Sequence, residues 1–194
     1  MYFKKSKMLW KIFQAIARDK EEKSSMKKEE FYPLVKSLLI DKGYRYYQEE
    51  KIQGKGRGRR KPDFVAVKEK YFLVGEIKSP SEPPTSPSWR SIQSFDTANM
   101  RRVREMVRKA EKEGKLPPEV GGHAIIMLGQ IQEYILLMGE RWIPPEEIRG
   151  KEILGAYAFP VEWFPQVEEA AKFFKIKVVG KIKNKKVGVC VIKI

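Results

Sequence analysis

The sequence predicts a single α/β domain, and three observations lead to that prediction. The chain has 194 residues, enough for one domain with a hydrophobic core and too few for two large ones. Two β-rich runs, PDFVAV and YFLVGEIKS, are separated by the short polar turn KEK, as in a hairpin of adjacent strands. Amphipathic helical patterns lie before and after this hairpin. We therefore expect a central mixed β-sheet flanked by helices, with the core order αβββαβ.

The first part of the chain supplies two helices and the beginning of the sheet. Residues 1–24 show an amphipathic pattern, which predicts an accessory helix that packs on the protein or in a dimer, or that lies on a membrane surface. A second amphipathic helix is expected over residues 29–42, with Gly43 as its natural stop. The stretch YRYYQEEKIQ predicts a first strand, and the GKGRGRRK that follows it predicts a loop.

The chain leaves the hairpin through the loop PSEPPTSPS, whose prolines exclude both a strand ladder and a helix interior. A long helix is then expected from Trp89 to about Glu113. The apolar run GHAIIMLG, residues 122–129, predicts another buried strand. We assign residues 29–130 to the core of the domain.

Residues 131–194 are expected to form a C-terminal extension of the same domain. IPPEEIRG predicts a turn, and PVEWFPQVEEAAKFF predicts a short helix. The final stretch, IKVVGKIKNKKVGVCVIKI, predicts a terminal β-hairpin that turns at Asn184.

The charge balance indicates a polyanionic partner. Lys and Arg total 40 against 25 Asp and Glu, a formal net charge of +15, which points first to nucleic acid. The charged fraction of 34% resembles thermophile usage. The single cysteine, Cys190, cannot form an intramolecular disulfide, so a cytoplasmic location is expected. One Cys and one His make no zinc site, no apolar run is long enough to span a bilayer, and no Walker A motif predicts a nucleotide cofactor.

Three charged residues interrupt the apolar runs of the hairpin, namely Asp63, Glu76 and Lys78. Side chains alternate along a strand, so Glu76 and Lys78 point to the same side. Antiparallel pairing across the KEK turn brings Asp63 close to them. Two converging carboxylates in an apolar setting are costly unless something compensates their repulsion. The alternative is an edge strand whose solvated face carries an ordinary surface pair, with Asp63 capping a turn.

A divalent cation compensates such a pair of acids. Mg²⁺ prefers hard oxygen ligands and typically takes one or two carboxylates together with substrate phosphate oxygens, and Mn²⁺ can substitute for it. The bound cation would activate water and neutralise the charge that develops at phosphorus. Lys78 would position or deprotonate the attacking water, or stabilise the transition state. The chemistry that these residues predict is phosphodiester hydrolysis.

Pro62-Asp63 followed after a short hairpin by Glu76-Ile77-Lys78, with a helix on each side, resembles the PD-(D/E)XK nuclease superfamily. Within it, the chain is most similar to archaeal Holliday-junction resolvases and to restriction-endonuclease-like members. The resemblance covers about residues 29–130 and implies a restriction-endonuclease-like core. It also implies that Asp63 and Glu76 are metal ligands, that the Ile77 carbonyl also contacts the metal, and that Lys78 is the catalytic lysine.

Many members of that superfamily add a glutamate from the helix before the sheet. Glu30 is the better match, because it stacks with Leu34 and Leu38 on the flank expected to face the sheet, whereas Glu29 does not. The alternative is an acid that only stabilises a helix N-terminus.

Two further positions follow from the resemblance. Gln93 matches a polar residue early in the helix after the motif, or it is a solvated glutamine. Ser79 directly follows the motif and either bonds the same phosphate or simply ends the strand.

The loop before Asp63 predicts a nucleic-acid contact. Its basic side chains would release counterions from phosphates, and its glycines let backbone N–H groups approach them. The alternative is a merely soluble loop. The basic residues of the loop are Lys55, Arg57, Arg59, Arg60 and Lys61.

Together these features predict a Mg²⁺-dependent DNA endonuclease, with branched DNA such as a Holliday junction as one possible substrate. A homodimer is expected, since symmetric cleavage of two strands needs two sites related by a two-fold axis. The alternatives are an exonuclease, a restriction-like or an RNA-cutting member of the same superfamily, and a DNA-binding protein that keeps the fold without turnover.

Overall fold

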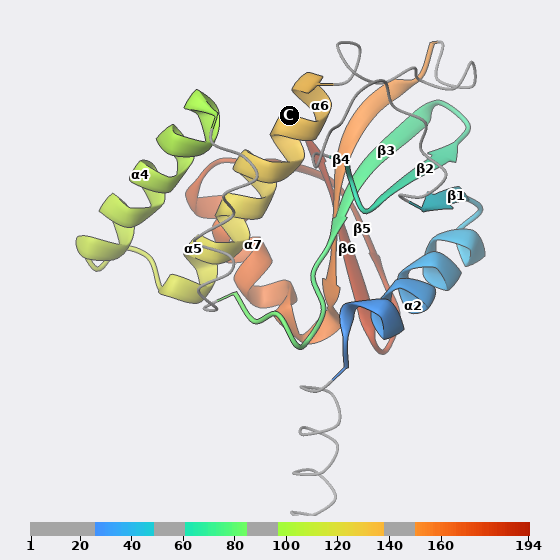
Figure 1. Ribbon diagram of the computed structural model, residues 1–194, viewed down its shortest axis with the longest axis horizontal. Coiled ribbons are helices and arrows are strands. Elements are labelled where there is room, and N and C mark those ends of the chain that lie inside the picture. The colour runs from blue at the N-terminus through green and yellow to red at the C-terminus, as the bar shows by residue number, and fades with distance from the viewer. Residues whose placement is uncertain (1–25, 49–60, 85–96, 138–149) are drawn as a thin grey trace, which may run out of the picture.

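A computed structural model of the protein describes residues 26–48, 61–84, 97–137 and 150–194. A six-stranded mixed β-sheet lies between helices, as the α/β prediction requires (Figure 1). The strand order is β1-β2-β3-β4-β6-β5. The strands are β1 (Arg45–Gln48), β2 (Phe64–Lys68), β3 (Tyr71–Ile77), β4 (Glu152–Pro160), β5 (Lys177–Lys183) and β6 (Val187–Lys193).

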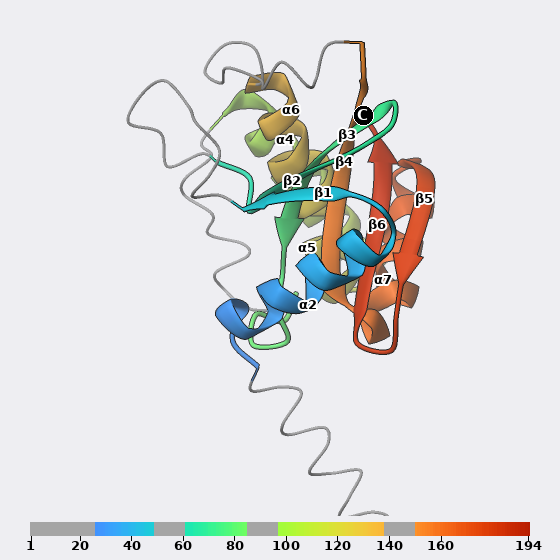
Figure 2. The same cartoon turned by 90° about the vertical axis from the view of Figure 1, so that its right-hand side faces the viewer.

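The helices form unequal layers on the two sides of the sheet (Figures 1 and 2). Among the described helices, α2 alone packs against one face of the sheet. The other face packs against the helices that follow β3 and β4, with α4 as the outermost of them. The helical elements are α2 (Lys28–Asp41), α4 (Ala98–Lys112), α5 (Pro118–Ala124), the π-helix η2 (Ile125–Ile131), α6 (Gln132–Leu137), the 3₁₀ turn η4 (Val161–Trp163) and α7 (Phe164–Phe173).

The local signals in the sequence identified several elements correctly. The first helix of the core is α2, and Gly43 follows it with a φ of 82°, a conformation that favours glycine. The predicted hairpin is β2 and β3, which pair antiparallel. The terminal hairpin is β5 and β6, and the Asn184 side chain accepts hydrogen bonds from the backbone N–H groups of Lys186 and Val187 at its turn. A short helix, α7, lies within residues 160–174 as expected.

The prediction of a strand over residues 122–129 is wrong. These residues lie in one helical run, formed by α5, η2 and α6. The run is apolar because it is buried between the sheet and α4, so its composition resembles that of a central strand. The strand that pairs parallel with β3 is instead β4, which lies beyond the range 29–130 expected for the core.

Several predictions concern residues outside the described ranges. They include the accessory helix of residues 1–24, most of the basic loop, the beginning of the helix expected from Trp89, and most of the IPPEEIRG turn. The described part of that long helix is α4. Among the described helices, none combines the length and apolarity needed to cross a membrane.

Candidate active site

The pairing of β2 with β3 places the two acids of the motif opposite each other. The last pair of this antiparallel ladder is Phe64 with Gly75, so one further step along both strands brings Asp63 level with Glu76. The Phe64 ring lies against Gly75 so closely that a Cβ at position 75 would be 2.0 Å from ring carbon Cζ. Glycine at this position therefore lets the two strands close directly beside the acids.

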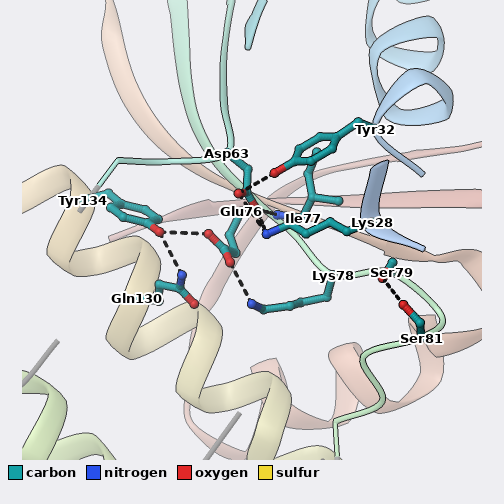
Figure 3. Close-up of polar contacts among 10 residues, drawn as sticks. All are labelled: Lys28, Tyr32, Asp63, Glu76, Ile77, Lys78, Ser79, Ser81, Gln130 and Tyr134. Atoms are coloured by element: carbon teal, nitrogen blue, oxygen red, sulfur yellow. Dashed lines mark hydrogen bonds and ion pairs between the residues drawn. The ribbon is translucent and has the colours of Figure 1, made fainter. Parts of the chain in front are cut away.

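Asp63 is held by three groups from two elements, β3 and α2 (Figure 3). The backbone N–H of Ile77, at the end of β3, donates to Oδ2 at 2.7 Å. The Tyr32 hydroxyl of α2 donates to Oδ1 at 2.7 Å. The Lys28 ammonium, from the first residue of α2, lies 3.0 Å from Oδ1 and 3.0 Å from Oδ2. The carboxylate is thus fixed in position by β3, the strand that carries Glu76, and by α2.

Glu76 points toward the other helical layer. The Lys78 ammonium lies 2.8 Å from Oε1. The Tyr134 hydroxyl of α6 donates to Oε2 at 2.9 Å, and in turn accepts a 2.8 Å hydrogen bond from Nε2 of Gln130 in η2. Lys78 is itself positioned by its backbone N–H, which donates to the Ala158 carbonyl of β4 at 2.9 Å. The cluster therefore joins the sheet to both helical layers (Figure 3).

The cluster of Asp63, Glu76 and Lys78 is buried. The alternative interpretation, in which Glu76 and Lys78 form a solvated surface pair on an edge strand, is therefore wrong. The exposed fractions of these residues are 6%, 2% and 7%. β3 lies between β2 and β4, so it is a central strand and not an edge strand. Buried charges at the end of a central strand are costly and call for a specific compensation.

The pKa values of the two acids are pushed apart. Burial and the neighbouring Glu76 charge raise the pKa of Asp63 to about 6, although Lys28, Tyr32 and the Ile77 N–H favour its ionised form. Burial also acts to raise the pKa of Glu76, but the ammonium groups of Lys78 and Lys28 outweigh it and hold that pKa below its ordinary value. Glu76 is therefore ionised at neutral pH, while Asp63 titrates close to the physiological range.

The donor set suits a hard divalent cation. Asp63 and Glu76 contribute carboxylate oxygens, which are ligands that Mg²⁺ prefers. Gln130 Oε1 is a buried acceptor that no described group satisfies with a hydrogen bond. No three His, Cys, Asp or Glu side chains converge within the described ranges, so the protein supplies two acids there. Such a site leaves coordination positions for water and substrate oxygens.

The structure places Glu30 away from this cluster, contrary to the expectation from helical spacing. Glu30 is exposed, and its carboxylate accepts a 2.9 Å hydrogen bond from the backbone N–H of Lys27. It therefore caps the N-terminus of α2, as the alternative proposed. Lys28 and Tyr32 are the residues of α2 that face Asp63.

The remaining predicted residues differ in how the structure places them. Ser79 is fully buried, and its hydroxyl lies 3.0 Å from that of Ser81. Lys61 is half-buried, two residues before Asp63. The other predicted nucleic-acid contacts lie outside the described ranges, namely Lys55, Arg57, Arg59, Arg60 and Gln93.

Four residues of the cluster were not identified from the sequence. Lys28 and Tyr32 are four residues apart on α2, and Gln130 and Tyr134 are four residues apart on one helical run. Residues at this spacing lie on the same side of a helix. The first pair therefore meets at Asp63, and the second pair forms a chain of hydrogen bonds to Glu76. Polar residues four positions apart on an otherwise apolar helix are the pattern that could have identified these four residues. The sequence does not show which strand such a pair faces.

His123 belongs to the packing between the sheet and α7. Its Nδ1 lies 2.9 Å from the Tyr157 hydroxyl of β4, and its Nε2 lies 3.1 Å from Oε1 of Gln166. Burial lowers the pKa of His123 to about 4, so the ring is neutral at pH 7.

Comparison of the chain with protein-family models, with curated proteins and with solved structures found no match.

Proposed function

We propose that the protein is a Mg²⁺-dependent nuclease with a PD-(D/E)XK-type, restriction-endonuclease-like core. The observation that supports the proposal best is the meeting of Asp63, Glu76 and Lys78 in one buried cluster at the end of two paired strands. Their residue types and order along the chain are those of the superfamily signature. A sheet with a helix before the hairpin and a parallel strand after a helical crossover is consistent with that core.

The residues of the cluster have distinct roles in this proposal. Asp63 and Glu76 would hold the Mg²⁺, for which Mn²⁺ can substitute, and Ile77 supplies the N–H that orients Asp63. When bound, the cation supplies Lewis-acid activation of the attacking water and of the phosphate. Water oxygen bonds to phosphorus while the bond to the leaving sugar oxygen breaks. The attacking water gives up a proton to solvent, and the leaving oxygen takes up a proton from solvent.

Lys78 stabilises charge in the transition state of this proposal. Its ammonium lies 2.8 Å from Oε1 of Glu76, and an ammonium group donates hydrogen bonds. A positioned ammonium in a buried site favours the charge that develops on the phosphate oxygens. Tyr134 is a positioning residue, because it holds the second oxygen of Glu76 through its hydroxyl.

DNA is the proposed substrate, because the net charge of +15 favours a polyanion and because the basic loop leads directly into Asp63. Branched DNA and a homodimer remain parts of the proposal. Exonuclease or restriction-like action on linear DNA, or cleavage of RNA, would use the same cluster.

The decisive experiment compares cleavage by four forms of the purified protein on several substrates. Junction DNA, linear duplex, single-stranded DNA and RNA are incubated with Mg²⁺, with Mn²⁺ or with EDTA. We expect metal-dependent cleavage by the wild type, and by Lys36→Ala, which removes an exposed lysine from α2. Asp63→Ala and Lys78→Ala are expected to be inactive. Equal cleavage by all four forms would show that a contaminant is responsible and would refute the proposal.

A DNA-binding protein without turnover is the second candidate. It is favoured by one observation: the two carboxylates already contact two ammonium groups, so the cluster is balanced in charge without a metal. This candidate predicts that no substrate is cleaved with any metal and that DNA binding survives Lys78→Ala. Fluorescence anisotropy with labelled DNA measures that binding.

A further inference from the structure

The charge of the candidate site is balanced by the chain itself. Asp63 and Glu76 carry two negative charges when both are ionised, and Lys28 and Lys78 supply two positive ones. Each ammonium lies within 3.0 Å of a carboxylate oxygen. A divalent cation added to this arrangement would meet two ammonium groups, and like charges at short range in a buried setting repel strongly. One of the lysines must therefore move when a metal binds.

We infer that Lys28 is a tethered counterion of Asp63 and Glu76, and that binding of a divalent cation to these two acids displaces its ammonium group. This inference rests on the proposed function. It assigns a role to a residue of α2 that is not part of the signature Asp63, Glu76 and Lys78.

Exposure distinguishes the two lysines. The Lys28 side chain is 26% exposed, whereas the Lys78 side chain is 9% exposed. The Lys28 ammonium can therefore turn into water, which repays the desolvation of its charge. Lys78 has much less access to water, and its ammonium lies 2.8 Å from Oε1 of Glu76.

The attachment of Lys28 also allows this movement. It is the first residue of α2, so its side chain can rotate without disturbing an internal helical turn. Asp63 stays oriented after the release, because Tyr32 still donates to Oδ1 and Ile77 still donates to Oδ2. Lys28 contacts both oxygens of Asp63, so its departure frees an acceptor direction on each of them.

The attraction that holds Lys28 comes from both proposed metal ligands. Glu76 and Asp63 raise the pKa of Lys28 well above its ordinary value, although burial acts in the opposite direction. A lysine drawn to the same two carboxylates as the cation competes with it directly. The apparent metal affinity is then the intrinsic affinity multiplied by the fraction of molecules in which the ammonium does not block the site.

The first test measures Mn²⁺ binding to the full-length protein by calorimetry, without DNA. Lys28→Met removes the charge and keeps much of the side-chain length. We expect it to bind Mn²⁺ roughly tenfold more tightly than the wild type, as for a site that is blocked about nine-tenths of the time. Lys36→Met, on the exposed side of the same helix, is the matched control and should bind as the wild type does. The gain from Lys28→Met should vanish in an Asp63→Asn background.

A second test uses the wild-type protein and does not depend on the folding of a variant. The amine is labelled with an acetylating reagent, and the extent of labelling at each lysine is measured by mass spectrometry. We expect Mg²⁺ to increase the labelling of Lys28, because its ammonium is released into water, and to leave the labelling of Lys36 unchanged.

The outcomes separate this inference from the proposed function. If the wild type binds Mn²⁺ and cleaves DNA, but Lys28→Met binds no more tightly and Mg²⁺ does not increase Lys28 labelling, only the counterion role is refuted. If neither form binds Mn²⁺ and no cleavage is seen, the counterion role and the nuclease are refuted together.

Discussion

The backbone N–H of Ile77 donates a 2.7 Å hydrogen bond to the Asp63 carboxylate, so each of the two acids is positioned by β3. Asp63 is oriented by a backbone group of that strand, and Glu76 belongs to it. The side chain of Asp63 therefore does not depend on a mobile partner for its orientation. This hydrogen bond still orients Asp63 when the Lys28 ammonium moves away.

Metal binding is expected to depend on pH through Asp63. Its pKa is raised to about 6, so a proton competes with the cation below that value. We expect Mn²⁺ affinity, measured by calorimetry, to change little through Asp63 above pH 7 and to weaken by about tenfold per pH unit below pH 6. An affinity that stays constant between pH 7 and pH 5 would contradict Asp63 as a ligand.

Tyr134→Phe is expected to impair the candidate site without unfolding the protein. The variant removes the hydroxyl that donates to Glu76 and accepts from Gln130, which leaves two buried polar groups without that partner. We expect a loss of about 1–3 kcal/mol in the free energy of unfolding, measured in urea. Single-turnover cleavage should slow by roughly tenfold, as for loss of a group that orients a reacting carboxylate.

The matched control for this variant is Tyr44→Phe. Tyr44 is half-buried and follows the C-terminal end of α2. Its ring is contacted by the ammonium of Lys68, which belongs to β2. Its ring is retained in the variant, so cleavage should equal that of the wild type. An equal loss of activity in both variants would mean that Tyr134 does not act through Glu76.

His123 is expected to make the protein less stable in acid. Its pKa is about 4 in the folded protein and near 6.5 in the unfolded chain, so the unfolded chain binds the proton more tightly. The stability from the neutral ring is present above pH 6.5 and is lost as the pH falls toward 4. Between pH 7 and pH 5 we expect this effect to lower the free energy of unfolding by roughly 2 kcal/mol.

His123→Gln isolates that effect from the other titrating groups. Asp63 changes charge in the same pH window but is present in both proteins, so it cancels in the comparison. Urea unfolding of the two proteins at pH 7 and pH 5 should show a smaller fall for the variant by that amount. Parallel falls would show that His123 is not held neutral by burial.

Gly75→Ala is expected to destabilise the protein. The added methyl group would overlap the Phe64 ring, with ring atoms 2.0 Å and 2.1 Å from the new carbon. We expect a loss of about 1–3 kcal/mol in the free energy of unfolding, as for other overpacked cores. Adding Phe64→Leu should recover part of the loss, because it removes the overlapping ring atoms. A stable single variant would show that the ring can move aside.

The sequence was sufficient to predict the hairpin of β2 and β3 and the meeting of Asp63, Glu76 and Lys78. These features depend on short-range pairing across a two-residue turn, where Glu69 takes a φ of 44°. Alternation along strands then fixes which residues share a face. Such features are visible in a window of about twenty residues.

The parts that could not be predicted depend on contacts between distant segments. Tyr134 reaches Glu76 across 58 residues of sequence, and no local pattern shows that contact. The strand expected over residues 122–129 proved to be helical, because a continuous apolar run fits a buried helix as well as a central strand. Glu30 lies on the predicted helix, but its carboxylate is used at the helix end. Periodicity alone does not decide between a cap and a site.

The number of residues in the π-helix η2 determines the direction in which Tyr134 points. η2 lies immediately before α6, which carries Tyr134. The wide turns of η2 therefore set the rotational phase of α6, that is, the side of the helix axis from which the Tyr134 side chain projects. We expect the deletion of one residue from 125–129, before Gln130, to change that phase. Tyr134 would then leave Glu76 although every side chain of the cluster was retained. We therefore expect insertions and deletions in η2 to disrupt the contact of Tyr134 with Glu76.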